Sequence, residues 1–139
     1  MSVRLTFNGL DQFRRALQQA PEELRREADE VIRETAADAA RSVESGYPEG
    51  PTGNLKRGVT MQHNSSKFGT VGVVRSRAKH ASIFERGTVQ RQTRRGANRG
   101  SMPQPPEAQR AIPKFVRARQ RMMSSLIEIV RQAGFQVDA

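Results

Sequence analysis

The sequence contains no cysteine and no long apolar run. Without cysteine it can form no disulfide framework, no thiolate nucleophile and no cysteine-ligated zinc or iron site. Apolar runs of a few residues are too short to span a bilayer, and the first residues lack the apolar block of a signal peptide. We therefore expect a protein that is made and kept in a cytoplasm-like compartment.

Acidic residues are scarce after residue 45. Residues 46–139 carry 17 basic and 5 acidic side chains, whereas residues 1–45 carry 7 basic and 9 acidic ones. The whole chain has a formal net charge of +10. This balance favours association with phosphate or with an acidic protein surface, and it does not distinguish between them.

Apolar residues are also fewer than usual. The chain has 139 residues, of which 35% are hydrophobic. This length corresponds to one domain, so we expect residues 1–139 to form a single domain with a lean core. We find no internal repeat and no linker that would divide the chain.

The N-terminal third shows clear periodicity. Alternating apolar residues predict a strand over residues 2–7, and Asn8-Gly9 predicts a turn after it. A helical stripe predicts a short helix over residues 10–19. A second, long helix is expected to begin at Pro21, with Glu22 and Glu23 in its first turn.

Glycine and proline then end the helical pattern between Gly46 and Asn54. Residues 59–63 and 68–74 predict a hairpin, with its turn at residues 64–67, lying beside the first strand. Residues 80–86 fit either a helical turn or an extended segment, and the pattern does not separate the two.

The last third combines a polar stretch with a helix. Residues 87–106 contain no acid and almost no apolar anchor, which predicts a long basic loop that is disordered until a partner binds it. An amphipathic stripe predicts a final helix over residues 113–133, ending at Gly134, with a tail at residues 134–139. The sequence therefore predicts an α+β fold: a small antiparallel sheet packed against a long N-terminal helix and a C-terminal helix, with long Gly/Pro/Arg-rich loops.

Residues with catalytic or ligating potential form no convincing constellation. His63 and His80 lack the spacing that would place two imidazoles on one helix face, so we expect no metal and no cofactor. His80 lies near Ser82 and Glu85, but no motif supplies a strained nucleophile turn or oxyanion donors. The glycines at 69 and 72 lack the lysine and helix of a phosphate loop and favour a close backbone approach. We expect no enzymatic activity, and a small hydrolase is a distant third hypothesis.

Four arginines of the 87–106 segment are the strongest polar signal: Arg91, Arg94, Arg95 and Arg99. They are phosphate-contacting residue types, but no aromatic residue among them could stack on a base. Three interpretations stay open: a solvated loop, a contact with an acidic neighbouring subunit, and a contact with DNA phosphates without sequence preference.

Three segments in order carry a resemblance to a known family. They are Pro51-Thr52-Gly53-Asn54-Leu55-Lys56-Arg57-Gly58-Val59, then His80-Ala81-Ser82-Ile83-Phe84-Glu85-Arg86-Gly87-Thr88, then Ala111-Ile112-Pro113-Lys114-Phe115-Val116-Arg117-Ala118. Together they resemble the small head-tail joining proteins of tailed bacteriophages and prophages, the neck or tail-completion family related to the phage lambda tail completion protein Z. His80, Arg86 and the split Pro113-Lys114-Phe115 depart from the usual pattern of that family.

The resemblance implies a structural virion protein made in the host bacterial cytoplasm. It implies a homo-oligomeric ring, sixfold or twelvefold, that joins or completes the head-tail interface, contacts connector, stopper, tail-tube or terminator proteins, and lets DNA pass. The alternative is a sequence-independent nucleic-acid-binding protein. The expected interface residues are Thr52, Gly53, Leu55, Phe84, Glu85, Gly87, Thr88 and Phe115, and the arginines expected to face DNA or an acidic partner are Arg91, Arg94, Arg95 and Arg99.

Overall fold

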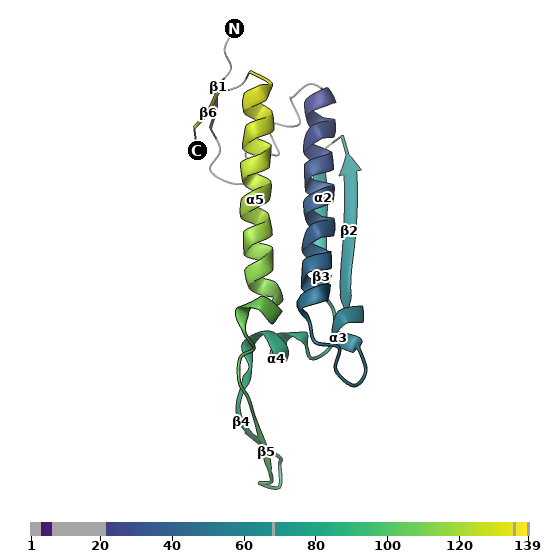
Figure 1. The fold of residues 1–139 in the computed structure, drawn as a ribbon, viewed down its shortest axis with the longest axis vertical. Helices are drawn as coiled ribbons and strands as arrows, with labels where there is room; N and C mark the ends of the chain where they lie inside the picture. The colour runs from purple at the N-terminus through teal and green to yellow at the C-terminus, as the bar shows by residue number, and fades with distance from the viewer. Residues whose placement is uncertain (1–3, 7–21, 68, 135, 139) are drawn as a thin grey trace. The chain divides into compact units, whose positions relative to one another are not determined.

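The computed structural model describes residues 4–6, 22–67, 69–134 and 136–138. Its helices and strands are drawn in Figure 1. In chain order they are β1 (Arg4–Thr6), α2 (Glu22–Gly46), α3 (Asn54–Arg57), β2 (Val59–Ser66), β3 (Gly69–Ser76), α4 (Ala81–Arg86), β4 (Thr88–Gln92), β5 (Asn98–Met102), a 3-10 turn (Glu107–Gln109), α5 (Ala111–Gln132) and β6 (Gln136–Asp138). The predicted α+β class, with a long N-terminal helix and a C-terminal helix, is confirmed. The short helix expected over residues 10–19 lies outside the described residues.

The strands form three separate pairs. β2 pairs with β3, β4 pairs with β5, and β1 pairs with β6. The β1–β6 pair is parallel, with Leu5 opposite Val137. The expectation that the β2–β3 hairpin lies beside the first strand is therefore wrong. β6 lies within the expected tail, and a three-residue strand is too short to show a period in the sequence.

The chain divides into two compact units. Unit one contains residues 1–38, 61–73 and 117–139, and unit two contains residues 39–60 and 74–116. The long elements α2, α5, β2 and β3 each contribute residues to both units.

The core of unit one lies between the first part of α2 and the second half of α5, which run side by side (Figure 1). Leu24, Ala28 and Ile32 of α2 are buried against Leu126 and Val130 of α5. Leu24, Ala28, Leu126 and Val130 lie on the stripes that the sequence predicted, whereas the buried Ile32 takes the place that the pattern gave to Val31.

Gly72 allows β3 to approach α2 closely within unit one. A Cβ atom at this position would lie 3.0 Å from Ala36 Cβ and 3.3 Å from Ile32 Cγ2. The expectation that the glycines of this strand serve a close backbone approach is confirmed for Gly72.

The core of unit two gathers apolar residues from the end of α2, the start of α5 and the short elements between them. Val43, Tyr47, Leu55, Ala81 and Ala111 are buried together. Half-buried Val59, Ala78, Phe84 and Phe115 pack around them. Because α3 has only four residues and α4 only six, the residues that hold helix ends are important for this unit.

Candidate functional site

Glu85 holds the start of α5. Glu85 is 6% exposed, and among the described residues it is the charged residue that is buried. The carboxylate accepts hydrogen bonds from the backbone amides of Ala111 and Ile112, the latter at 3.3 Å. These are the first two residues of α5, and Pro113 behind them has no amide hydrogen to satisfy. The negative charge therefore sits at the positive end of the helix dipole, which compensates its burial.

Tyr47 supports this carboxylate from the other side. Its hydroxyl donates to Glu85 Oε1 at 3.1 Å and lies 3.0 Å from Ser76 Oγ. Burial raises the pKa of Tyr47 to about 12, and the nearby negative charge of Glu85 adds to this, although the Ser76 hydrogen bond opposes it. Its ring meets Phe84 edge to face, with centroids 5.4 Å apart. Tyr47 thus remains a neutral donor that fixes Glu85 in place.

Gly87 and Thr88 form a crossing point with the end of β5. Gly87 has φ 70° and ψ −177°, a region that is essentially restricted to glycine. A Cβ atom there would lie 2.6 Å from Met102 O and 2.7 Å from Gln104 N. The Met102 amide donates to Thr88 Oγ1 at 3.0 Å, and Gln104 Nε2 donates to Glu85 O at 3.1 Å. We call the contacts of residues 85–88 with residues 102–104 the crossing.

Lys114 acts at the opposite helix end in unit two. Its Nζ donates to the carbonyl of Ser42 at 2.7 Å, near the C-terminus of α2. The last turn of α2 has no basic residue of its own. Lys114 therefore supplies the positive charge that the negative end of this helix dipole favours.

The Thr52–Leu55 segment is a turn with one buried anchor. Gly53 caps α3 in the left-handed conformation, at φ 64°. Thr52 is exposed, and its Oγ1 accepts a hydrogen bond from the Asn54 amide at 3.4 Å. Leu55 points into the core at 5% exposure.

All the expected interface residues belong to unit two, and several of them pack in its core. Leu55 and Glu85 are buried, and Phe84 and Phe115 are half-buried in the same core. Gly87 and Thr88 lie in the crossing, and Thr52 remains on the surface. Packing of the single chain accounts for the buried ones, and their role at a subunit interface stays a prediction.

The 87–106 segment is a β-hairpin, although a long loop was expected. β4 and β5 pair antiparallel, with Thr88 opposite Met102 and Arg91 opposite Gly100. The turn is closed by the Thr93 amide donating to Ala97 O at 2.8 Å and by the Ala97 amide donating to Thr93 Oγ1 at 3.0 Å. The sequence did not predict these strands, because a hairpin that buries neither face needs no alternation of apolar and polar residues.

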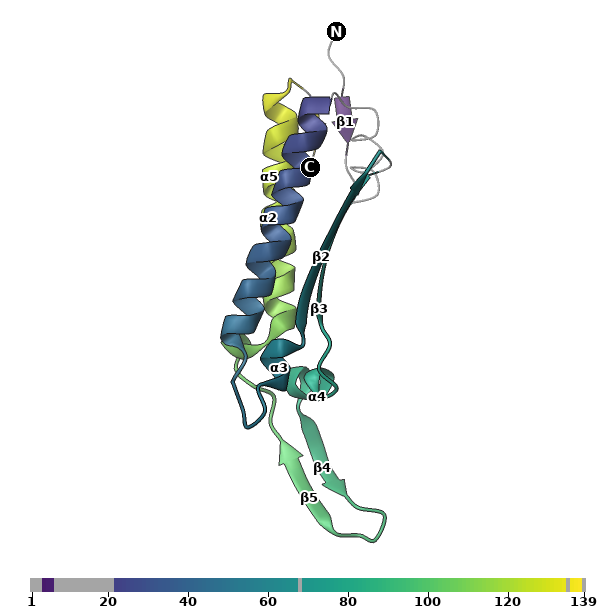
Figure 2. The ribbon, with the colours of Figure 1, turned by 90° about the vertical axis from the view of Figure 1, so that its right-hand side faces the viewer.

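We call residues 88–102 the arginine ribbon; it extends from α4 within unit two (Figure 2). Its four arginines, Arg91, Arg94, Arg95 and Arg99, are all exposed. None of their side chains makes a hydrogen bond or ion pair with another described residue. Val89 in the same strand is 85% exposed. The ribbon also shifts register on both sides of Arg91, and such bulges commonly redirect side chains.

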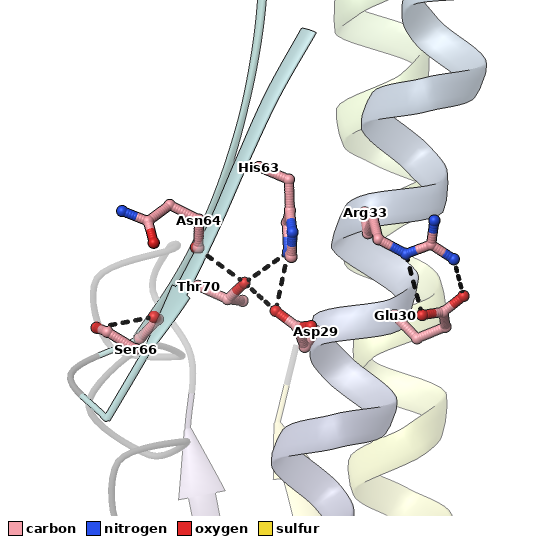
Figure 3. A network of polar contacts seen from close by, with 8 residues as sticks. Asp29, Glu30, Arg33, His63, Asn64, Ser66 and Thr70 are labelled. Carbon is pink, nitrogen blue, oxygen red and sulfur yellow. Dashed lines mark hydrogen bonds and ion pairs between the residues drawn. The ribbon is translucent and has the colours of Figure 1, made fainter.

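A second polar cluster joins α2 to the β2–β3 hairpin in unit one (Figure 3). His63 Nε2 lies 2.9 Å from Asp29 Oδ1 and 3.2 Å from Thr70 Oγ1, and the Thr70 hydroxyl donates to the same Asp29 oxygen. One imidazole nitrogen thus faces both partners, and the threonine proton is directed to the carboxylate. A nucleophile relay needs two different imidazole nitrogens, so this arrangement clamps helix to hairpin.

Sequence reasoning missed this cluster. Its members are separated by 34 and 41 positions and share no motif. The one signal available was an aspartate on the side of α2 that also carries Ile32 and Ala36, which places a carboxylate beside the sheet.

Asp29 makes the clamp sensitive to acid. Burial acts to raise the pKa of the Asp29 carboxyl, but hydrogen bonds from Thr70, Ser65 and His63 outweigh it, and the pKa lies below its ordinary value. Ionised Asp29 therefore stabilises the fold above the unfolded-state pKa of about 3.9. This contribution is lost as the pH falls through the lower folded-state pKa.

We expect the difference in unfolding free energy between the wild type and Asp29→Asn to be full above about pH 5 and to narrow toward about pH 2. Urea unfolding across that range measures it. Glu44→Gln, an exposed carboxylate on the same helix, serves as the control and should differ little from the wild type at any pH. If the difference in unfolding free energy between the wild type and Asp29→Asn did not change with pH, ionised Asp29 would not be the group that stabilises the clamp.

Fold and site together define a small α+β protein whose buried polar groups hold helix ends and the crossing, and which carries four exposed arginines on a β-hairpin of unit two. The family described as "Bacteriophage HK97-gp10, putative tail-component" matches residues 11–87. The match covers more than half of the chain, and the chain belongs to this HK97-gp10-like family. It therefore has a structural role as a component of a phage tail and a place in the virion.

The matched segment has a clear C-terminal boundary. It includes α2, α3, the β2–β3 hairpin and α4, and it ends at Gly87, within the crossing. The arginine ribbon and α5 lie beyond it. No curated protein and no solved structure matches the chain. A relation to the lambda protein stays a prediction.

No helix in the described ranges combines the length and apolar content needed to cross a membrane.

Proposed function

We propose that this chain forms a homo-oligomeric ring in the phage neck, sixfold or twelvefold, which joins or completes the head-tail interface and lets DNA pass. The arginine ribbon is the observation that carries the proposal. It projects four unpartnered arginines and an exposed valine, and the core of unit two needs none of them. A two-stranded hairpin is marginally stable by itself, so a neighbouring surface is expected to order it.

The same geometry supports a role without chemistry. Glu85, the acid of the His80–Ser82–Glu85 hypothesis, is buried and occupied by helix amides and Tyr47. His63 is engaged by Asp29 and Thr70. In this proposal the chain is made in the host cytoplasm, takes its place beside connector, stopper, tail-tube or terminator proteins, and catalyses no reaction.

Charge reversal on the ribbon tests the proposal. We expect Arg94→Glu with Arg95→Glu to leave the fold intact and to block joining of filled heads to tails, because both side chains are exposed and without a described partner. Electron microscopy counts joined particles, and plaque assays give the infectious yield. Arg119→Glu with Arg121→Glu, an equally exposed pair on α5, is the matched control.

A phage that lacks the chain supplies the second arm. Unjoined heads and tails are expected without it, and normal joining would overturn the proposed function. Wild-type infectious yields with the Arg94 and Arg95 reversal would show that the arginine ribbon has no part in joining heads to tails.

A sequence-independent nucleic-acid binder is the second candidate, and the same four arginines favour it. A protein that neutralises several phosphates loses affinity for duplex DNA steeply as salt rises, with a logarithmic slope near −0.9 per contact. A ring component should show little affinity for free DNA. Binding of a labelled duplex across a salt series separates the two candidates.

A further inference from the structure

The arginine ribbon has a charge that would be attracted to an acidic surface, and α2 carries such a surface. Between Glu22 and Gly46 the sequence has eight acidic and four basic side chains, a net charge of −4. Residues 87–106 have four basic side chains and no acid, a net charge of +4. One chain thus holds two exposed segments of opposite charge.

The acids of α2 are not scattered around the helix. Five of them recur at intervals of three or four residues and therefore share one face. All five are exposed, whereas the apolar residues Leu24, Ala28 and Ile32 occupy the buried face. We call this face the acidic stripe; it comprises Glu23, Glu27, Glu30, Glu34 and Asp38.

Arg33 neutralises part of this face. It forms an ion pair with Glu30 (Figure 3), and both side chains are about half exposed. Glu27 and Glu34 lie on either side of that pair. These two carboxylates are the best candidates for an external cation.

Long side chains on both surfaces allow several charged groups to meet at once. Glu27 and Glu34 are seven residues apart, about 10.5 Å along a helix. Arg91 lies in β4, and Arg94 and Arg95 follow three and four residues later in the turn of the ribbon. Guanidinium groups often form bidentate pairs with carboxylates.

Val89 favours a protein partner over DNA. It is 85% exposed two residues before Arg91. An apolar side chain beside the cations gains from contact with the aliphatic stems of a helix surface and gains nothing from a phosphate backbone.

We propose that the arginine ribbon of one subunit docks on the acidic stripe of a neighbouring copy of this chain. The inference rests on the proposed homo-oligomer and names the surface through which its subunits meet. Like charges would repel if either side were reversed, and opposite charges would be restored if both were.

Two complementary variants test this docking. The ribbon variant carries Arg94→Glu and Arg95→Glu, and the stripe variant carries Glu27→Arg and Glu34→Arg. Each full-length variant alone should self-associate at least about tenfold more weakly than the wild type, because the two reversed side chains then face charges of their own sign. An equimolar mixture should recover the wild-type mass distribution, since the reversed side chains of one variant then face the reversed side chains of the other, which have the opposite sign. Sedimentation velocity at low salt measures all three samples.

Matched controls use exposed charges elsewhere. Arg119→Glu with Arg121→Glu controls the ribbon variant, and Glu44→Arg with Glu49→Arg controls the stripe variant. Both controls should associate as the wild type does. Circular dichroism confirms that each variant is folded, and the neutral pairs Arg94→Gln with Arg95→Gln and Glu27→Gln with Glu34→Gln should show weaker losses in the same direction.

The outcomes separate this inference from the function on which it rests. Wild-type association by the ribbon or stripe variant, or a mixture that fails to recover, would overturn the docking while leaving a ring assembled through other surfaces. Loss of duplex-DNA binding by the ribbon variant with self-association unchanged would show that the partner is DNA. A wild-type chain that stays monomeric at every concentration would overturn both the ring and the docking.

Discussion

Replacing Glu85 with alanine is expected to lower the free energy of unfolding by about 3 kcal/mol or more, because each buried donor left unpaired costs about 1–3 kcal/mol. The change orphans the amides of Ala111 and Ile112 and leaves the Tyr47 hydroxyl with Ser76 as its partner. It also removes the anion from the start of α5. Urea unfolding followed by circular dichroism measures the loss.

Graded variants assign that loss to its parts. Tyr47→Phe removes one donor and should cost about 1 kcal/mol. Glu85→Gln keeps an acceptor oxygen but loses the charge, so its loss of unfolding free energy should lie between those of Tyr47→Phe and Glu85→Ala. Glu44→Ala, an exposed acid on α2, should change stability by no more than about 0.5 kcal/mol. If Glu85→Ala were as mild as Glu44→Ala, the carboxylate would not be holding the helix.

Gly87→Ala is expected to be the most damaging glycine substitution, at about 3 kcal/mol or more. The backbone conformation alone costs about 1–3 kcal/mol for a residue with a side chain. The added methyl group would also lie 2.6 Å from Met102 O and 2.7 Å from Gln104 N, so the backbone of the crossing must shift. The same unfolding measurement reports the loss.

Gly96→Ala provides the matched control. Gly96 also has a positive φ, 82°, but nothing lies within 4 Å of its added Cβ. It should therefore show the conformational cost alone, about 1–2 kcal/mol. Equal losses at both positions would mean that the close approach at Gly87 contributes nothing.

The two long helices could be predicted from sequence because each buries one face. The β2–β3 hairpin was predicted from an alternating pattern, although none of its described residues is fully buried. The structure confirms all three within a few residues. The pattern of α5 was not predicted in detail: Val116 is 52% exposed, whereas Ala118 is 4% exposed. A small buried alanine carries too weak a signal to compete with a larger apolar neighbour.

The arginine ribbon and the helix caps show where periodicity stops being informative. β4 and β5 bury almost nothing, so no apolar alternation marked them and a loop was predicted there. Glu85 and Gly87 were singled out by resemblance, but the role of Glu85 depends on amides 26 and 27 positions away. Contacts of this kind follow from the folded arrangement and leave no local pattern.

The crossing holds the two ends of the arginine ribbon together without any contact from residues 89–101. Thr88 and Met102 are tied together, and Glu85 and Gln104 are tied together, by bonds that involve no residue from 89 to 101. The length, charge and sequence of residues 89–101 can therefore change while the core of unit two keeps its structure. Substitutions confined to the arginine ribbon can give the chain a new binding preference, so its recognition of partners can evolve independently of its ability to fold.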